Sequence, residues 1–210
     1  MKFEQYAVVI GFCLLVSCRQ EPAIDKLAVP NTIDLFQYKT GNTWVYEVII
    51  SHEDPSVIPT FASNDTITVV GDSLIRGHIY KKIRIIESGG RSISFYRDSI
   101  GCLINNSGKI LFSMINQGLL YNHTFVVSGK DTIYSFFDLM DGASRNINVP
   151  FGNFNAYSKT RFTTFPTPKE PIKRVSQSFY APGIGLISYE KFFIGSKRAS
   201  ITSKLIQLKL

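Results

Sequence analysis

Three histidines, His52, His78 and His123, are the side chains here best suited to metal binding or to proton transfer near neutral pH. They lie in unrelated segments, and only the weak pair Glu53 and Asp54, next to His52, could add cation ligands. The sequence also lacks a Gly-x-Ser-x-Gly nucleophile elbow. We therefore predict no catalytic residue, no metal site and no cofactor. The protein is expected not to be an enzyme; a hydrolase whose groups meet only in the fold is the less favoured alternative.

The clearest chemistry lies at Cys18, which follows an apolar run over residues 6–16. This run is too short to span a bilayer, which takes about 20 apolar residues, and it fits the core of a signal peptide. The segment Leu15-Val16-Ser17-Cys18 resembles the bacterial lipobox. The resemblance implies diacylglyceryl transfer to the Cys18 sulfur and cleavage before it. We predict a lipoprotein signal peptide over residues 1–17.

A tether is expected to follow, over residues 18–33, because Pro22 and Pro30 interrupt any regular structure there. Two or three acyl chains on one residue anchor a domain stably to a membrane. Arg19, rather than Asp, follows the lipidated cysteine, and nothing suggests retention in the inner membrane. We predict a cell-envelope protein anchored in the outer membrane, facing either the periplasm or the outside.

Cys102 is the one thiol left over, since Cys13 belongs to the signal peptide and Cys18 is acylated. An intramolecular disulfide is therefore not expected. A lone thiol in an oxidising compartment is usually buried, and we predict a core position for Cys102. A catalytic thiol is the alternative, although no histidine lies near it in sequence.

Four of the nine aspartates are followed by Ser or Thr and then by Ile or Leu. This pattern resembles the O-glycosylation sequon of Bacteroidota, which makes four hydroxyls candidate glycosylation sites: Thr66, Ser73, Ser99 and Thr132. The alternative is structural, because an aspartate in a turn followed by a β-branched residue is a common way to begin a strand.

The elements that position these residues are expected to be strands. Aromatic residues make up 13% of the chain, and residues 44–51 place Trp44, Tyr46, Val48 and Ile50 on one face. The expected strands are residues 44–51, 66–70, 78–88, 91–97, 102–104, 109–114, 124–127, 132–137, 155–165, 175–181, 186–193 and 199–210. Short turns separate most of them, among them residues 71–73, 76–77, 89–90, 105–108, 128–131 and 182–185.

Helical patterns are weak, with room for a turn or two at residues 112–120 and 138–143. We predict an all-β, single-domain fold over residues 34–210. Its antiparallel meander should be strongly curved and form a sandwich or a partly open barrel, with little helix.

Three segments resemble an uncharacterised family of Bacteroidota envelope lipoproteins: K-T-G-N-T-W-V-Y at residues 39–46, V-P-F-G-N-F at 149–154 and Y-A-P-G-I-G at 180–185. The resemblance covers residues 35–210. It implies a curved β-sheet, in the manner of the LolA/LolB-like half-barrels that carry lipoproteins, and no established activity. In structural terms, Val149-Pro150 is expected to start a strand and Gly152-Asn153 to turn Phe154 inward.

Charge is concentrated in the last quarter of the chain. Residues 159–210 hold ten Lys or Arg against two Glu, whereas the whole chain has a net charge of +7. Strand alternation predicts that Phe154 and Phe162 point to the core. The cations should then form a stripe on the outer face: Lys159, Arg161, Lys191 and Lys204.

These observations lead to a functional expectation of a lipid-anchored envelope protein with a non-enzymatic binding or scaffolding role. The alternative is a carrier of lipid or acyl chains in a half-barrel cavity. The expected partners are the membrane, through Cys18, and then other envelope proteins or an anionic lipid or glycan that the basic stripe would attract. Nucleic acid is not expected as a partner.

Overall fold

The fold is built from strands. The computed structural model describes residues 36–115, 118–167, 170–194 and 196–210, with only the backbone of residues 119–124. These residues contain twelve strands and no helix, so the all-β prediction is confirmed. No helix long and apolar enough to cross a membrane occurs among them. The predicted signal peptide, Cys18 and the whole tether lie outside the described residues.

The strands follow one another in a meander. Their bounds are β1 Thr43–Ser51, β2 Thr60–Ile75, β3 His78–Glu87, β4 Gly90–Ser99, β5 Cys102–Asn105, β6 Ile110–Ser113, β7 Gly118–Ser128, β8 Asp131–Val149, β9 Gly152–Phe165, β10 Ile172–Ala181, β11 Gly185–Phe192 and β12 Ser200–Lys209.

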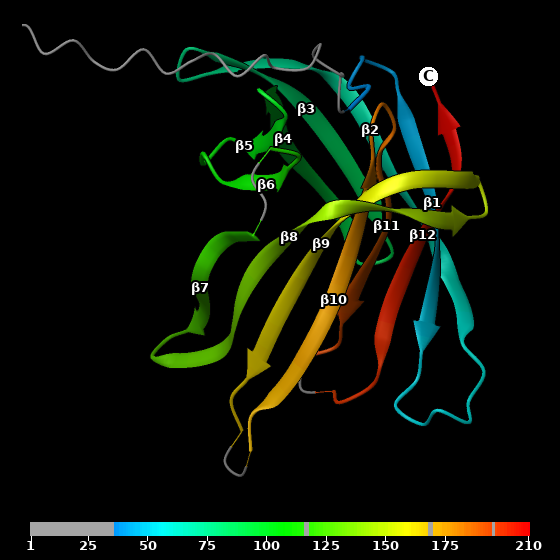
Figure 1. Cartoon of the computed structure of the whole chain (residues 1–210), viewed down its shortest axis with the longest axis vertical. Helices are drawn as coiled ribbons and strands as arrows, with labels where there is room; N and C mark the ends of the chain where they lie inside the picture. The colour runs from blue at the N-terminus through cyan, green and yellow to red at the C-terminus, as the bar shows by residue number, and fades with distance from the viewer. Residues whose placement is uncertain (1–35, 116–117, 168–169, 195) are drawn as a thin grey trace, which may run out of the picture.

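All twelve strands belong to a single sheet, in the order β6-β5-β4-β3-β2-β1-β12-β11-β10-β9-β8-β7. Every described pair of neighbours is antiparallel. Only the central pair, β1 with β12, joins strands that are distant in sequence. The two halves of the chain therefore form the two halves of the sheet, and β6 and β7 are its edges (Figure 1).

Tight turns join most neighbouring strands, and several were visible in the sequence. The pairs β3–β4, β5–β6, β7–β8 and β10–β11 turn at the expected glycine-containing segments. In the last of these, Gly183 and Gly185 adopt φ values of 74° and 98°. A side chain at Gly185 would also lie 3.1 Å from the Phe36 ring, so both its backbone and its surroundings favour glycine.

Three local predictions are wrong. The turn expected at residues 71–73 is instead a bulge inside β2 between Val69 and Gly71, because the ladder with β3 resumes at Gly71 paired with Lys82. Residues 138–143, a candidate helical turn, belong to strand β8. Val149 ends β8 rather than starting a strand, and Pro150 lies in the turn before β9, where its missing N–H breaks no ladder bond.

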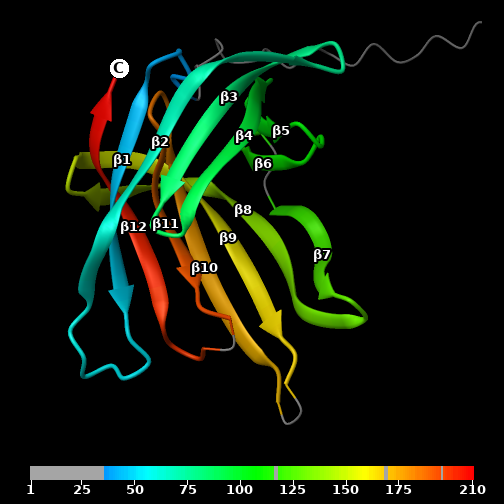
Figure 2. The ribbon, with the colours of Figure 1, turned by 180° about the vertical axis from the view of Figure 1, so that it is seen from behind.

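The sheet curls so strongly that its two halves face each other, and β3 and β4 cross the strands of the second half in both views (Figures 1 and 2). An aromatic cluster joins them. The Phe112 ring on β6 stacks on Tyr180 of β10 with centroids 4.2 Å apart, and Phe36 meets both rings edge-on. Leu103 and Met140 complete this buried cluster. The result is the partly open barrel that was one of the two predicted forms.

The main core lies beside this junction. Trp44 and Tyr46, predicted to share the core face of β1, are both buried. The Trp44 indole N–H donates to Ile184 O at 2.8 Å, and the Tyr46 hydroxyl donates to Leu186 O at 2.8 Å. These two side chains thus tie β1 to the β10–β11 hairpin across the curl, and each polar tip keeps a partner in the core.

The β8–β9 hairpin bends across β12, as Figure 1 shows. Its tip is held there by a backbone hydrogen bond from Phe151 N to Leu205 O. Val149 and Ala156 pack into the same buried cluster as Leu205, and Phe154 packs against it, as predicted. The ladder between β8 and β9 is interrupted between Met140 and Ser144, which gives β8 the extra length it needs to bend.

The burial of Trp44 makes a stability prediction. Trp44→Ala should lower the free energy of unfolding by about 3–5 kcal/mol, because the substitution leaves a cavity and removes the bond to Ile184 O. Chemical denaturation of the purified protein measures this. Leu74→Ala is the control, since Leu74 is 74% exposed and its loss should change stability little. Equal stability of both variants would contradict the core role of Trp44.

Candidate functional site

The candidate site is a cavity of about 550 Å³ between the two halves of the curled sheet. One wall comes from β2, β3 and β4, with Ile67, Ile85, Glu87 and Tyr96. The other wall comes from β8 to β11 and includes Lys159, Arg161, Phe165, Tyr189 and Lys191. The volume lies within the range of small-molecule sites, and the lining combines apolar side chains with a few charged groups, as such sites do.

An ion pair holds the wall on the β8–β9 side. Asp138 on β8 is 2% exposed, and its two carboxylate oxygens accept hydrogen bonds from Arg161 Nε at 2.7 Å and Arg161 Nη2 at 2.8 Å. The two residues are directly paired across the β8–β9 ladder, which fixes their geometry. Burial raises the pKa of Asp138, but the hydrogen bonds from Arg161 and the positive charges of the neighbouring Lys159, Arg161 and Lys109 together outweigh burial and lower that pKa overall.

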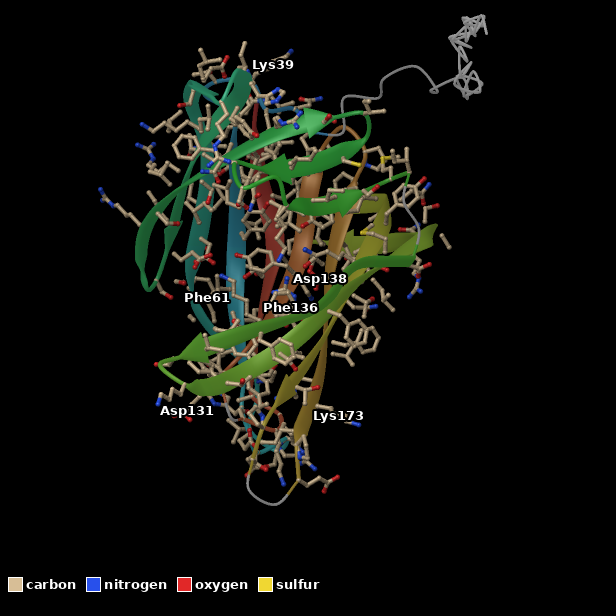
Figure 3. The ribbon with its side chains drawn as sticks, turned by 90° about the vertical axis from the view of Figure 1, so that its left-hand side faces the viewer. Lys39, Phe61, Asp131, Phe136, Asp138 and Lys173 are labelled. Atoms are coloured by element: carbon tan, nitrogen blue, oxygen red, sulfur yellow. The ribbon has the colours of Figure 1, made fainter. Side chains whose placement is uncertain are left out.

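Two lysines surround this ion pair. Lys159, two residues before Arg161 on β9, donates from Nζ to the backbone oxygen of Leu111 on β6 at 3.1 Å. Lys109, just before β6, places Nζ 4.9 Å from the centre of the Phe136 ring, and the Arg161 guanidinium lies 4.0 Å from the same ring. Figure 3 shows Phe136 and Asp138 in the middle of the molecule. One edge of the sheet thus meets the opposite half at a group of cations.

Both lysines lose proton affinity here. Burial lowers the pKa of Lys159 to about 8, because the charged ammonium is poorly solvated, although the Asp138 carboxylate acts in the other direction. Burial also lowers the pKa of Lys109, and the nearby Arg161 charge adds to that effect. Burial therefore disfavours the charged form of both lysines at this site.

The opposite side of the cavity is electrically closer to neutral. Lys191 on β11 pairs with Glu87 on β3 at 2.6 Å, which bridges the two halves. The Tyr189 hydroxyl donates to Asp65 Oδ2 at 3.0 Å, and burial raises the pKa of Asp65. Glu190 accepts a hydrogen bond from the backbone N–H of Gln177 at 3.3 Å. The carboxylates on this side are engaged with the protein itself.

A smaller recess of about 100 Å³ adjoins the cavity. The two spaces share Ile67, Ile85, Tyr96 and Leu186, and the recess is otherwise lined mainly by aromatic and apolar residues such as Trp44 and Leu103. Leu111, whose carbonyl accepts the hydrogen bond from Lys159, also lines the recess. The Lys159 ammonium therefore lies at the boundary between the charged cavity and the apolar recess.

A polar clip fixes the rim of the cavity near Phe192 and Ile194. The Glu53 carboxylate, in the β1–β2 loop, accepts hydrogen bonds from the backbone N–H groups of Lys197, Arg198 and Ala199. Together with a hydrogen bond from the Ser196 hydroxyl, these lower the pKa of Glu53 to about 2. Arg174 donates to the carbonyls of the same loop and lies 4.0 Å from the Phe192 ring. These contacts hold residues 196–199 beside the β1–β2 loop.

The basic outer stripe predicted from the sequence is wrong. Lys159, Arg161 and Lys191 line the cavity inside the curl, and only Lys204 lies on the other face, beside the buried Ser203 and Leu205. Phe162 is likewise not a core residue; it stacks on Phe137, with ring centroids 4.8 Å apart, on the face of β9 opposite Arg161. The bend of the β8–β9 hairpin explains the error. It buries the Phe154 face of β9 near the start of the strand and leaves that face uncovered further along.

The histidines and the cysteine considered as candidate catalytic or metal-binding residues do not form a cluster. His52 lies within 3.3 Å of Thr60, and His78 starts β3 at the far end of β2, while the His123 side chain is outside the described part. Cys102 is buried, as predicted, and its thiol is 3.3 Å from the Ser113 hydroxyl. No group of three or more His, Cys, Asp or Glu able to hold a metal occurs in the described ranges.

The four candidate glycosylation sites all lie in strands: Thr66 and Ser73 in β2, Ser99 in β4 and Thr132 in β8. Thr132 is exposed, and the other three are half-buried. Asp65, before Thr66, is a buried strand residue bound to Tyr189, so the turn explanation does not hold there.

Two solved structures share this fold. One comes from Bacteroides fragilis and is provisionally described as an exported protein with a YmcC-like fold; it has 14% sequence identity and a TM-score of 0.52. The other is provisionally described as a lipoprotein from Parabacteroides distasonis, with 13% identity and a TM-score of 0.51. Each alignment covers 83% of this chain and 98% of the other. Neither the family models nor the curated proteins gave a match.

The lowered pKa of Lys159 predicts how stability depends on pH. Between pH 8 and the ordinary lysine value of 10.5, the unfolded state binds more protons, so the free energy of unfolding rises with pH. Relative to Lys159→Met, the parent should gain about 1–2 kcal/mol between pH 7 and pH 9.5.

Chemical denaturation at the two pH values measures this difference. Staying below pH 10 avoids the opposite contribution of Tyr46 and Tyr180, whose pKa values burial raises. A constant difference between parent and variant across the range would show that Lys159 keeps an ordinary pKa.

Proposed function

We propose that this protein is a lipid-anchored protein of the cell envelope that binds a small ligand in the concave face of its sheet and does not transform it chemically. The observation that carries the proposal is the cavity of about 550 Å³ between the two halves of the sheet. Folded interiors are normally packed with few voids larger than a water molecule. A space of this size with a mixed lining is what ligand binding requires.

The envelope location is supported by the sequence and by the names of the two similar structures. Residues 6–18 carry the lipobox-like signal, and the neighbours are provisionally described as an exported protein and a lipoprotein. Membership of the Bacteroidota lipoprotein family, through the motifs at residues 39–46, 149–154 and 180–185, is part of the same proposal. So is anchoring in the outer membrane through acylated Cys18.

A non-enzymatic role is supported by how the ionisable groups of the cavity are used. Arg161 is held by both oxygens of Asp138, Lys191 is paired with Glu87, and Lys159 binds a main-chain carbonyl. Each of these contacts links different strands, so these groups build the walls. Catalytic acids and bases must instead be poised to exchange protons with a substrate.

Transport of lipid or acyl chains is the second candidate. The apolar recess of about 100 Å³ favours it, because this recess continues the cavity toward Trp44 and Leu103 and would take hydrocarbon. Other envelope proteins and glycans would then be partners that deliver or receive the ligand. Glycosylation at Thr66, Ser73, Ser99 and Thr132 is compatible with either candidate.

Binding is tested with N-phenyl-1-naphthylamine, an uncharged apolar dye that fluoresces when it leaves water. We expect the purified protein to bind it with a single saturable site. Ser178→Phe should weaken binding at least about tenfold, because Ser178 lines the cavity and the larger ring fills it.

Ser135→Phe is the matched control. Strand alternation places Ser135 on the side of β8 opposite Phe136, outside the cavity lining, so the same substitution should leave dye binding unchanged. Absence of saturable binding, or equal effects of the two variants, would contradict the proposed function.

Lipidation makes a separate prediction. Cys18→Ala should abolish incorporation of radiolabelled palmitate and move the protein from the membrane fraction to the soluble fraction or leave it unprocessed, since the sulfur carries the lipid. Cys102→Ala, which removes a buried thiol of the fold, is the control and should keep its label. A labelled Cys18→Ala protein would refute the anchor.

A further inference from the structure

We propose that the cavity selects anionic amphiphiles: ligands with one negatively charged head group, a carboxylate or a phosphate, and an apolar body. The head group would lie against Lys159 and Arg161, and the apolar body would run along Ile67, Ile85 and Leu186 toward the recess. This inference rests on the proposed binding function and adds the chemical class of the ligand.

The first argument is the charge surplus on one wall. Two cations that line the cavity, Lys159 and Arg161, lie beside one buried carboxylate, Asp138, whose two oxygens already accept both hydrogen bonds from Arg161. One carboxylate charge can therefore neutralise only one of these two positive charges. Surplus positive charge in a poorly solvated place is costly, and an anion that enters beside it relieves that cost.

The second argument is the contact that Lys159 makes. Its ammonium group binds a neutral carbonyl, Leu111 O, rather than a carboxylate. An ammonium has three N–H donors, and this carbonyl takes one of them. A carboxylate or phosphate oxygen in the cavity would accept a charge-assisted hydrogen bond, which is about twice as strong as one between neutral groups.

The third argument is that the lining is positively charged at one side only, which sets the orientation of a bound ligand. On the far side, Glu87 is paired with Lys191, and Glu190 is bound to the main chain of Gln177, so this side offers no comparable surplus. The residues shared by cavity and recess are mainly apolar. A ligand charged at one end only therefore matches the site better than a metal cation, which the surplus repels, or a dianion with two distant charges.

Two dyes with the same hydrocarbon skeleton test this. 8-Anilinonaphthalene-1-sulfonate carries a sulfonate that N-phenyl-1-naphthylamine lacks. We expect the purified protein to bind the sulfonated dye at least about tenfold more tightly, a ratio that corresponds to one good charged contact. Lys159→Met should remove most of that preference, so that the two dyes bind with similar affinities. Lys159→Arg should restore it, and Lys204→Met, on the other face, should have no effect.

A second measurement uses the unaltered protein, in case Lys159→Met does not fold. Affinity for the sulfonated dye should fall as the pH rises from 7 to 9.5, because Lys159 loses its proton over this range. Asp138 and Arg161, which face the same space, keep their charges over this range. The neutral dye should show no such decline.

Competition then distinguishes the sources of the charge. Dodecanoate and dodecyl phosphate should displace the sulfonated dye, and dodecanol should not at the same concentration; the better competitor identifies the head group. If neither dye binds, the proposed function itself fails. If the neutral dye binds as tightly as the sulfonated one, or dodecanol competes as well as dodecanoate, ligand binding stands and selection for anions is overturned.

Discussion

The stacking of Phe112 on Tyr180 is the contact on which the rest of the structure depends. The sheet is one continuous ladder of twelve strands, and hydrogen bonds along a ladder do not by themselves decide how far it curls. Rings 4.2 Å apart, from β6 near one edge and β10 in the other half, set that degree of curl. Phe36, packed edge-on against both, closes the same end. Beyond this aromatic contact the two halves are joined by polar contacts such as Lys191 with Glu87, and a space of about 550 Å³ remains between them.

The charges in that space follow from this geometry. Curling places the inward side chains of β9 opposite the carbonyls of β6, so a side chain between them must be long and must offer a donor. Lys159 meets both demands, and Asp138 with Arg161 keeps the adjacent wall rigid. Such groups stabilise little in net terms, because desolvation offsets much of their attraction. These groups instead fix the positions of the strands that carry them, and they create a positive electrostatic potential for a ligand in the cavity.

The sequence predicted the elements well because local patterns decide them. Alternation in residues 44–51 placed Trp44 and Tyr46 in the core, and Gly183 and Gly185 marked a turn that needs positive φ. Sequence patterns predicted the structure wrongly where pairing with another strand determines the local conformation. Gly71 looks like a turn but adjoins a bulge, since β3 continues to pair beyond it. The cationic lining of the cavity was not predicted for the same reason: alternation shows that Lys159 and Arg161 share a face, but only the curl and the bend of β8–β9 make that face the inner one.

The pairing of β1 with β12 has a consequence for how the chain reaches this form. Trp44 pairs with Leu208 and Ser51 with Ser200, so the two halves of the sheet are joined by contacts between the first and last strands. Every other ladder in the sheet joins neighbours along the chain. During synthesis each half can form hairpins as it emerges, but the ladder between them must wait for the final residues. Completion therefore requires closing a very long loop, a step that topology makes slow. Until then the sheet can exist only as two separate meanders, each without its partner along β1 or β12.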